Sequence, residues 1–174
     1  MLKEVDTTKN RGVSDNYRTW ANGQIVLVKF MPGGSKMLRD KVMAYAKEWE
    51  KHANIVFKFV SDTTKNTNIR IKLGKGSGHN SAVGTEANFR PQSNQTMNFD
   101  TLFFADGDYY VAKLQKKGMK APYSLNQLIT EMKEDPNHWS IAEMRRVVVH
   151  EFGHSLGLLH EQSYPGAVNW KRTD

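Results

Sequence analysis

The sequence has 174 residues, 39% of them hydrophobic and 10% aromatic, a composition typical of one folded domain and not of a disordered chain. Cysteine is absent, which excludes disulfide scaffolds, cysteine zinc sites and thiol nucleophiles. The net charge of +7 favours nucleic-acid binding only weakly, because the lysines and arginines are dispersed and match no binding motif.

The first half of the sequence predicts a sheet with one long helix. Residues 1–19 are polar and without a period, and we expect an N-terminal arm followed by one domain over 20–174. Ser35 is expected to cap a helix that runs to about Lys51, with apolar residues at helical spacing. Runs rich in Ile, Val and Phe, or with alternating apolar residues, predict strands at 24–30, 55–60, 68–73, 81–85 and 96–100.

The second half predicts two helices. Asp106 and Asp108 flank a glycine, and because two carboxylates are far short of a calcium ligand set we expect a turn there. Ser124 with Gln127 forms a capping box for a helix to about Lys133. A second capping box, Ser140 with Glu143, opens the helix that continues through residue 154.

This last helix carries the strongest functional signal. His150 and His154 lie four residues apart, about 40° around a helix axis, so both imidazoles project from one face. Gly157 can adopt a positive φ that ends the helix, which allows His160 to return as a third ligand. Three neutral imidazoles leave a coordination position open, as catalytic zinc sites do. Glu151, next to the first histidine, would be the general base.

The opposing interpretation is an ordinary amphipathic helix with histidines in polar contacts. It requires three histidines, one glutamate and one glycine to fall into register by accident within eleven residues. The other three histidines, His52, His79 and His138, have no such partners, and we expect surface or capping roles for them.

The stretch from His150 to His160 resembles the signature of the metzincin zinc endopeptidases. The resemblance implies an α+β fold with a twisted, mostly parallel five-stranded sheet, an antiparallel edge strand, a long first helix and a zinc-binding active-site helix. It also implies one catalytic Zn²⁺ and a polypeptide substrate that pairs with the edge strand. That strand would consist of Ser81, Ala82, Val83, Gly84 and Thr85.

Within the metzincins the sequence is most similar to bacterial astacin-like peptidases. Glu161, which follows the third histidine, carries this similarity and would anchor a mature N-terminus in an astacin. Pro165 and the pair Asn169 and Trp170 are similar to the segment that follows the motif in those peptidases, whereas residues 152–158 equally resemble matrix metalloproteinases. Unlike animal astacins, the chain has no cysteine. Metzincins have a methionine-containing turn, the Met-turn, well downstream of the third histidine. The 14 residues after His160 contain no methionine, so we expect a truncation before the Met-turn.

The sequence therefore predicts a zinc-dependent endopeptidase, secreted or extracytoplasmic although no signal peptide is visible. A propeptide, an inhibitor or a missing C-terminal segment are candidate partners, and no membrane association is expected. Two alternatives stay open: a zinc-binding but proteolytically inactive fragment or interaction module, and a basic nucleic-acid-binding domain supported only by the charge.

Overall fold

The computed structural model describes residues 13–15, 17–74, 78–100, 107–134 and 141–160, and a five-stranded sheet forms its centre. The strand order is β3-β2-β4-β6-β5, with all pairs parallel except the antiparallel pair of β5 with β6. The predicted mostly parallel sheet with an antiparallel edge strand is thus confirmed. The strands are β2 (Ile25–Phe30), β3 (Val56–Phe59), β4 (Ile69–Gly74), β5 (Asn80–Ser81) and β6 (Met97–Asp100).

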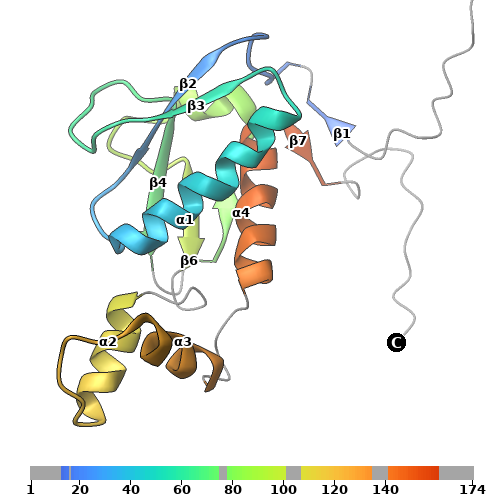
Figure 1. Cartoon of the computed structure of the whole chain (residues 1–174). Helices are drawn as coiled ribbons and strands as arrows, with labels where there is room; N and C mark the ends of the chain where they lie inside the picture. The colour runs from blue at the N-terminus through green and yellow to red at the C-terminus, as the bar shows by residue number, and fades with distance from the viewer. Residues whose placement is uncertain (1–12, 16, 75–77, 101–106, 135–140, 161–174) are drawn as a thin grey trace, which may run out of the picture.

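Two helices pack against each other and against one face of this sheet (Figure 1). Helix α1 (Lys36–Ala46) begins at the predicted cap, where Ser35 Oγ accepts from Leu38 N at 3.3 Å. The α-helix ends at Ala46, before the predicted Lys51. The remaining predicted residues form a more tightly wound 3₁₀ helix, η2 (Lys47–Lys51), as is common at the end of an α-helix. Helix α4 (Ile141–Ser155) carries the histidine motif.

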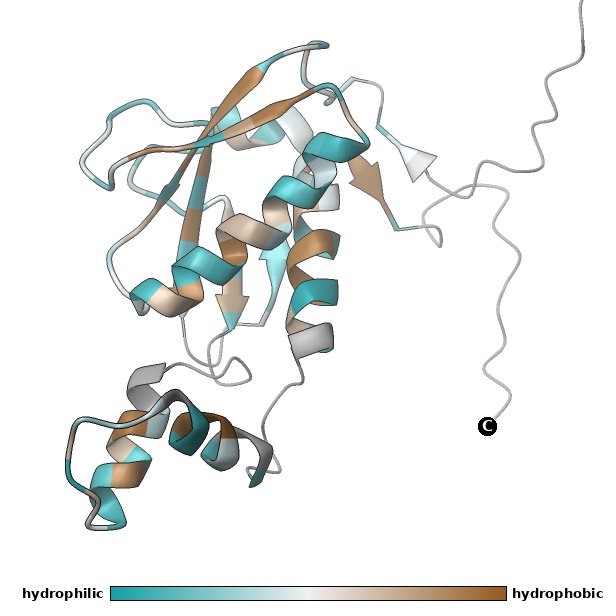
Figure 2. Cartoon of the chain, viewed as in Figure 1, coloured by the Kyte–Doolittle hydropathy of each residue, from teal (hydrophilic) through white to brown (hydrophobic). Residues whose placement is uncertain are grey.

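The core lies between the sheet and these two helices, where apolar strand and helix residues meet (Figure 2). Leu38, Val42 and Ala46 form the buried stripe of α1, as their helical spacing predicts. In α4, Val148 and Phe152 are fully buried, and the Phe152 ring meets that of Phe57 edge to face with centroids 5.0 Å apart. The histidine helix is therefore a core element of the domain.

On the other face of the sheet Arg70 is completely buried. Its guanidinium donates to carbonyl oxygens of two neighbouring segments, residues 67–68 and 87–94, and burial lowers the pKa of this side chain. A buried cation is tolerated only when its hydrogen bonds are satisfied, so Arg70 fixes the loops that surround it. The acceptors are the backbone oxygens of Thr67, Asn68, Ala87, Arg90 and Asn94.

The predicted edge strand over 81–85 is wrong in its extent. Strand β5 ends at Ser81, and Gly84 and Thr85 begin a 3₁₀ helix, η3 (Gly84–Phe89). Gly84 has a φ of +50°, and Thr85 N donates to Arg18 O at 2.8 Å, so the chain leaves the sheet plane. Ala82 and Val83 connect the strand to this helix and do not extend the strand.

A helical hairpin follows the sheet and lies beyond the N-terminal end of α4 (Figure 1). Helix α3 (Leu125–Glu134) begins with the predicted capping box, since Gln127 N donates to Ser124 Oγ and Ser124 N donates to Gln127 Oε1. Helix α2 (Gly107–Lys116) contradicts the predicted turn and contains Asp108, whereas Asp106 lies outside the described residues. Tyr110 and Leu114 are both buried and lie four residues apart, so they form one apolar face of α2, as expected for a packed helix.

A second, two-stranded sheet joins distant parts of the sequence: β1 (Val13–Ser14) pairs antiparallel with β7 (Leu158–Leu159). Residues 13–19, which the sequence assigned to an arm, thus include a paired strand. Among the described helices none is long and apolar enough to cross a bilayer.

We predict that Gly84→Ala destabilises the protein much more than Gly118→Ala. Both glycines have a positive φ, for which an alanine costs about 1–2 kcal/mol. A Cβ at Gly84 would lie 1.7 Å from Arg18 O, whereas one at Gly118 meets nothing within 4 Å. Backbone displacement should add roughly 1–3 kcal/mol at position 84 alone, measured by denaturant unfolding. Equal losses for the two variants would contradict the close approach of Arg18.

Candidate metal centre

Helix α4 and the turn after it bring the three motif histidines together. His150 and His154 occupy successive turns of α4, which ends at Ser155. Gly157 then takes a φ of +99° while its N–H donates to His154 O at 2.9 Å. This reversal leads into β7 and returns His160 to the exposed face of the helix, as the sequence predicted.

The imidazole Nε2 atoms of the three histidines form a nearly equilateral triangle. The separations are 3.1 Å between His150 and His154, 2.9 Å between His154 and His160, and 3.1 Å between His150 and His160. Nitrogen ligands about 2.0–2.1 Å from a tetrahedral zinc ion lie roughly 3.3 Å apart. Three Nε2 atoms gathered at nearly this spacing around one point form a geometry that fits a bound zinc ion.

The ring of His154 is oriented by its other nitrogen. His154 Nδ1 lies 2.7 Å from Leu158 O, and since a carbonyl can only accept, Nδ1 carries the hydrogen. The Nε2 atom of a neutral His154 is then the one with a free lone pair, which is the tautomer that a metal ligand needs. Burial, with the neighbouring His154 and His160, lowers the pKa of His150, which favours a neutral ring there too.

Glu151 differs from the histidines because its side chain is buried. Only 6% of the residue is exposed, and burial raises the pKa of its carboxyl group. Its Oε2 atom has no hydrogen-bond partner among the described residues. A buried carboxylate oxygen without a partner is costly, which makes Glu151 a candidate for a functional role next to His150.

Two tryptophans from outside the motif hold α4 in place. Trp20 Nε1 donates to Ser155 O at 2.7 Å and so satisfies a carbonyl at the end of the helix. Trp49 Nε1 donates to Val149 O at 2.9 Å, next to His150. The Trp49 ring also packs closely on Gly153, where a Cβ would lie 3.1 Å from Trp49 Cζ2.

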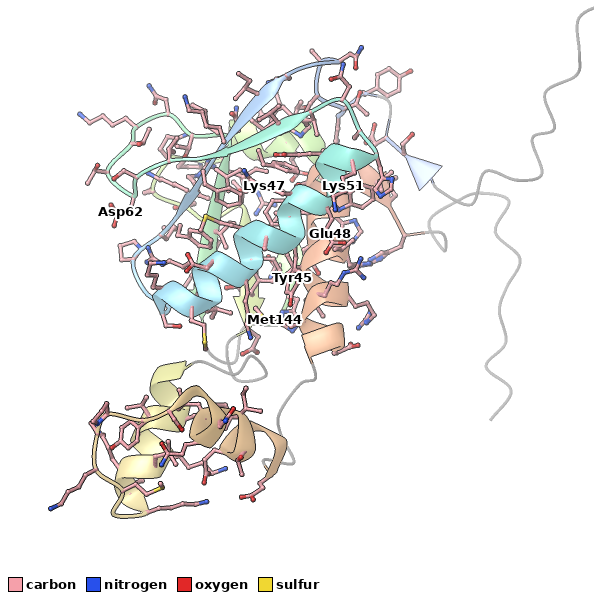
Figure 3. The ribbon with its side chains drawn as sticks, viewed as in Figure 1. Tyr45, Lys47, Glu48, Lys51, Asp62 and Met144 are labelled. Atoms are coloured by element: carbon pink, nitrogen blue, oxygen red, sulfur yellow. The ribbon has the colours of Figure 1, made fainter. Side chains whose placement is uncertain are left out.

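An ion pair also joins α4 to the segment after α1. Glu48 lies on the side of this segment turned toward α4 (Figure 3), where Arg145 donates to both of its carboxylate oxygens. These hydrogen bonds hold the pKa of Glu48 below its usual range, with smaller contributions from the charges of Arg145, Lys51 and His52.

The other predicted site residues have mixed outcomes. Strand β5 lies beside α4, but only Ser81 of the five predicted edge residues belongs to it. Glu161 and His138 lie outside the described residues. His52 is exposed and caps the end of η2, whereas His79 is half-buried and its Nδ1 accepts from Asp100 N at 3.2 Å. Sequence reasoning gave Trp20 no role and treated Trp49 only as part of the apolar stripe of the first helix, so it missed their hydrogen bonds to α4.

Comparison with known proteins places this geometry in context. The matrixin family model, Peptidase_M10, matches residues 33–169. A structure of myroilysin is 30% identical, with a TM-score of 0.63 over 89% of this chain and 58% of that one. A second myroilysin crystal structure is also 30% identical, with a TM-score of 0.58 over 85% and 49% of the two chains. The chain thus spans less than two thirds of myroilysin.

High choriolytic enzyme 1, a hatching enzyme zinc-protease from Oryzias latipes (medaka fish), is 13% identical, with a TM-score of 0.42 over 83% of this chain and 49% of that one. A search of curated protein sequences gave no match.

We predict that Glu48→Gln lowers the unfolding midpoint in a pH-dependent way. Because the folded pKa of Glu48 is lowered, its stabilisation is complete above the unfolded value of about 4.3 and is lost as the pH falls through the folded value. Thermal unfolding at neutral pH should show a loss of roughly 1–3 °C that shrinks under acid conditions.

The control is Glu143→Gln, because Glu143 pairs with Arg146 three residues along the same helix. We expect a smaller loss for it. A loss for Glu48→Gln that did not change with pH would contradict the assignment to the Arg145 pair.

Proposed function

The chain belongs to the matrixin family of metzincin metallopeptidases, and from this premise we propose that it is the catalytic part of a zinc-dependent endopeptidase. The family implies a zinc cofactor and a polypeptide substrate. The observation that carries the proposal for this chain is the Nε2 triangle of His150, His154 and His160, with a buried glutamate beside it.

We assign the three histidines as the zinc ligands. Their Nε2 atoms are close enough for one ion, and the hydrogen bond from His154 Nδ1 to Leu158 O holds one ring in the tautomer required. When bound, zinc supplies Lewis acidity, which acidifies water and polarises a carbonyl oxygen.

We assign Glu151 as the general base. Its carboxylate lies one residue from His150 and is sheltered from solvent, and burial raises its pKa toward the range in which a carboxyl group both accepts and releases a proton. An Oε2 atom without a hydrogen-bond partner among the described residues is available to accept the proton of the attacking water. The same carboxyl would then deliver that proton to the leaving amine nitrogen.

We propose that the substrate lies along β5. This strand is at the edge of the sheet and next to α4, so an extended peptide can add to it by backbone hydrogen bonds. The available edge is shorter than the sequence predicted, because Ala82 N already donates to Thr96 O and Thr85 N to Arg18 O. Peptide pairing is therefore expected over Asn80, Ser81 and Val83.

Secretion and the astacin-like subfamily belong to the same proposal. Metzincins are typically extracellular, which supports an extracytoplasmic protein. The astacin-like assignment, and the anchoring of a mature N-terminus by Glu161, rest on the sequence resemblance alone.

The zinc assignment predicts about one zinc ion per chain by metal analysis. His160→Ala removes one of three ligands and should weaken binding by 100-fold or more in a competition titration with a chelator. The exposed His52 lies outside the triad, so His52→Ala should leave the zinc affinity unchanged. Equal affinities for His160→Ala and the wild type would remove His160 from the ligand set.

The base assignment predicts that Glu151→Gln retains zinc but loses hydrolysis of denatured casein by at least 10²-fold, because an amide cannot take up the proton. Glu143→Gln on the exposed part of the same helix should keep both properties. Activity that survives in Glu151→Gln would contradict the assignment. A wild type that binds zinc without any hydrolysis would instead support the inactive-module alternative.

A further inference from the structure

Residues 13–15 and 17–20, which we call the N-terminal clasp, cross the turn that carries His160. Asp15 N donates to Gly157 O at 2.8 Å, and β1 pairs with β7 in the register Val13 to Leu159 and Ser14 to Leu158. In the described part of the chain, β7 pairs with no other strand. The clasp therefore supplies the strand pairing of Leu158 and Leu159 and the partner of Gly157 O, while Gly157 N and Leu158 O bond to His154.

The clasp also covers Gly157 closely. A Cβ at this glycine would lie 3.2 Å from Thr19 Cγ2 and 3.6 Å from both Arg18 O and Asp15 O. The turn that returns His160 is thus packed between α4 and the clasp.

The far end of the clasp is fixed to the core. Trp20 is buried, and its Nε1 donates to Ser155 O, the last residue of α4. Arg18 O accepts from Thr85 N at 2.8 Å, and the Arg18 guanidinium lies 3.1 Å from Glu86 Oε2. Since these contacts anchor residues 18–20 to α4 and η3, the backbone of residues 13–15 has a defined position from which to hold β7.

We propose that the N-terminal clasp positions His160 for zinc, so that ordering of the clasp and zinc binding are coupled. This inference rests on the zinc assignment made above. His150 and His154 are fixed by α4 itself, whereas His160 follows a two-residue strand that has no other sheet to join. Because coupling is reciprocal, zinc should stabilise the clasp as much as the clasp strengthens zinc binding.

The direct test compares Asp15→Pro with Asp15→Ala. Proline removes the N–H that bonds Gly157 O, and Ser14 before it is already extended, as a residue preceding proline prefers. Alanine keeps the N–H and removes only the carboxylate that contacts Tyr17 N and Arg18. We expect zinc binding about tenfold weaker in Asp15→Pro than in Asp15→Ala, measured by chelator competition.

The His160→Ala background separates positioning from general destabilisation. If the clasp acts through His160, Asp15→Pro and Asp15→Ala should bind zinc equally in that background. Equal affinities of the two variants in the wild-type background, or the same tenfold difference without His160, would overturn the inference. A wild type whose affinity matches that of His160→Ala would instead overturn the zinc assignment itself.

Amide exchange on the unsubstituted chain gives a second measurement that needs no proline variant. Added zinc should slow exchange of the Asp15 N–H by about tenfold or more in the wild type, and not in His160→Ala. No slowing in a wild type shown to bind zinc would also overturn the inference.

Discussion

The candidate centre depends on one reversal of the chain directly after α4. Two ligands one turn apart on a helix are easily specified, but a third nitrogen within about 3 Å of both requires the backbone to turn back within a few residues. Gly157 makes this possible because a φ of +99° is strained for any residue with a Cβ, and that Cβ would lie only 3.2 Å from Thr19 Cγ2. The glycine of the motif therefore contributes to the geometry of the site together with its histidines.

The precision of that reversal comes from elements outside the motif. Trp20 donates to the carbonyl at the end of α4, and Trp49 donates to the carbonyl of Val149 in its middle. On the exposed side of α4, Arg145 donates to Glu48. Behind the sheet, Arg70 donates to Ala87 O within η3, and Thr85 N of η3 donates to Arg18 O. Hydrogen bonds thus link the buried arginine to the clasp through η3, and support of this kind holds metal ligands in their positions.

Much of the fold and of the site could be predicted, because the signals involved are local. Each of these signals depends only on residues that are close in the sequence. They are the spacing of the three histidines His150, His154 and His160, the Ser35 cap, and the alternation of Ile69, Ile71 and Leu73. The failures have non-local causes. Strand β5 is short because Thr85 bonds to Arg18, 67 residues earlier, and α2 is helical because its apolar face packs on α3. In these short segments the sequence periodicity is weak, and tertiary contacts determine the secondary structure.

The same distinction explains why the residues before Trp20 had no recognisable pattern. A two-residue strand such as β1 has no periodicity to detect, and its partner β7 lies about 145 residues later in the sequence. Few backbone hydrogen bonds hold the two strands, with that from Asp15 N to Gly157 O beside them, so they are the part of the site most easily opened. A metal ion that recruits His160 would add its binding energy at this weakest point of the centre, so occupancy and order at the turn should rise together.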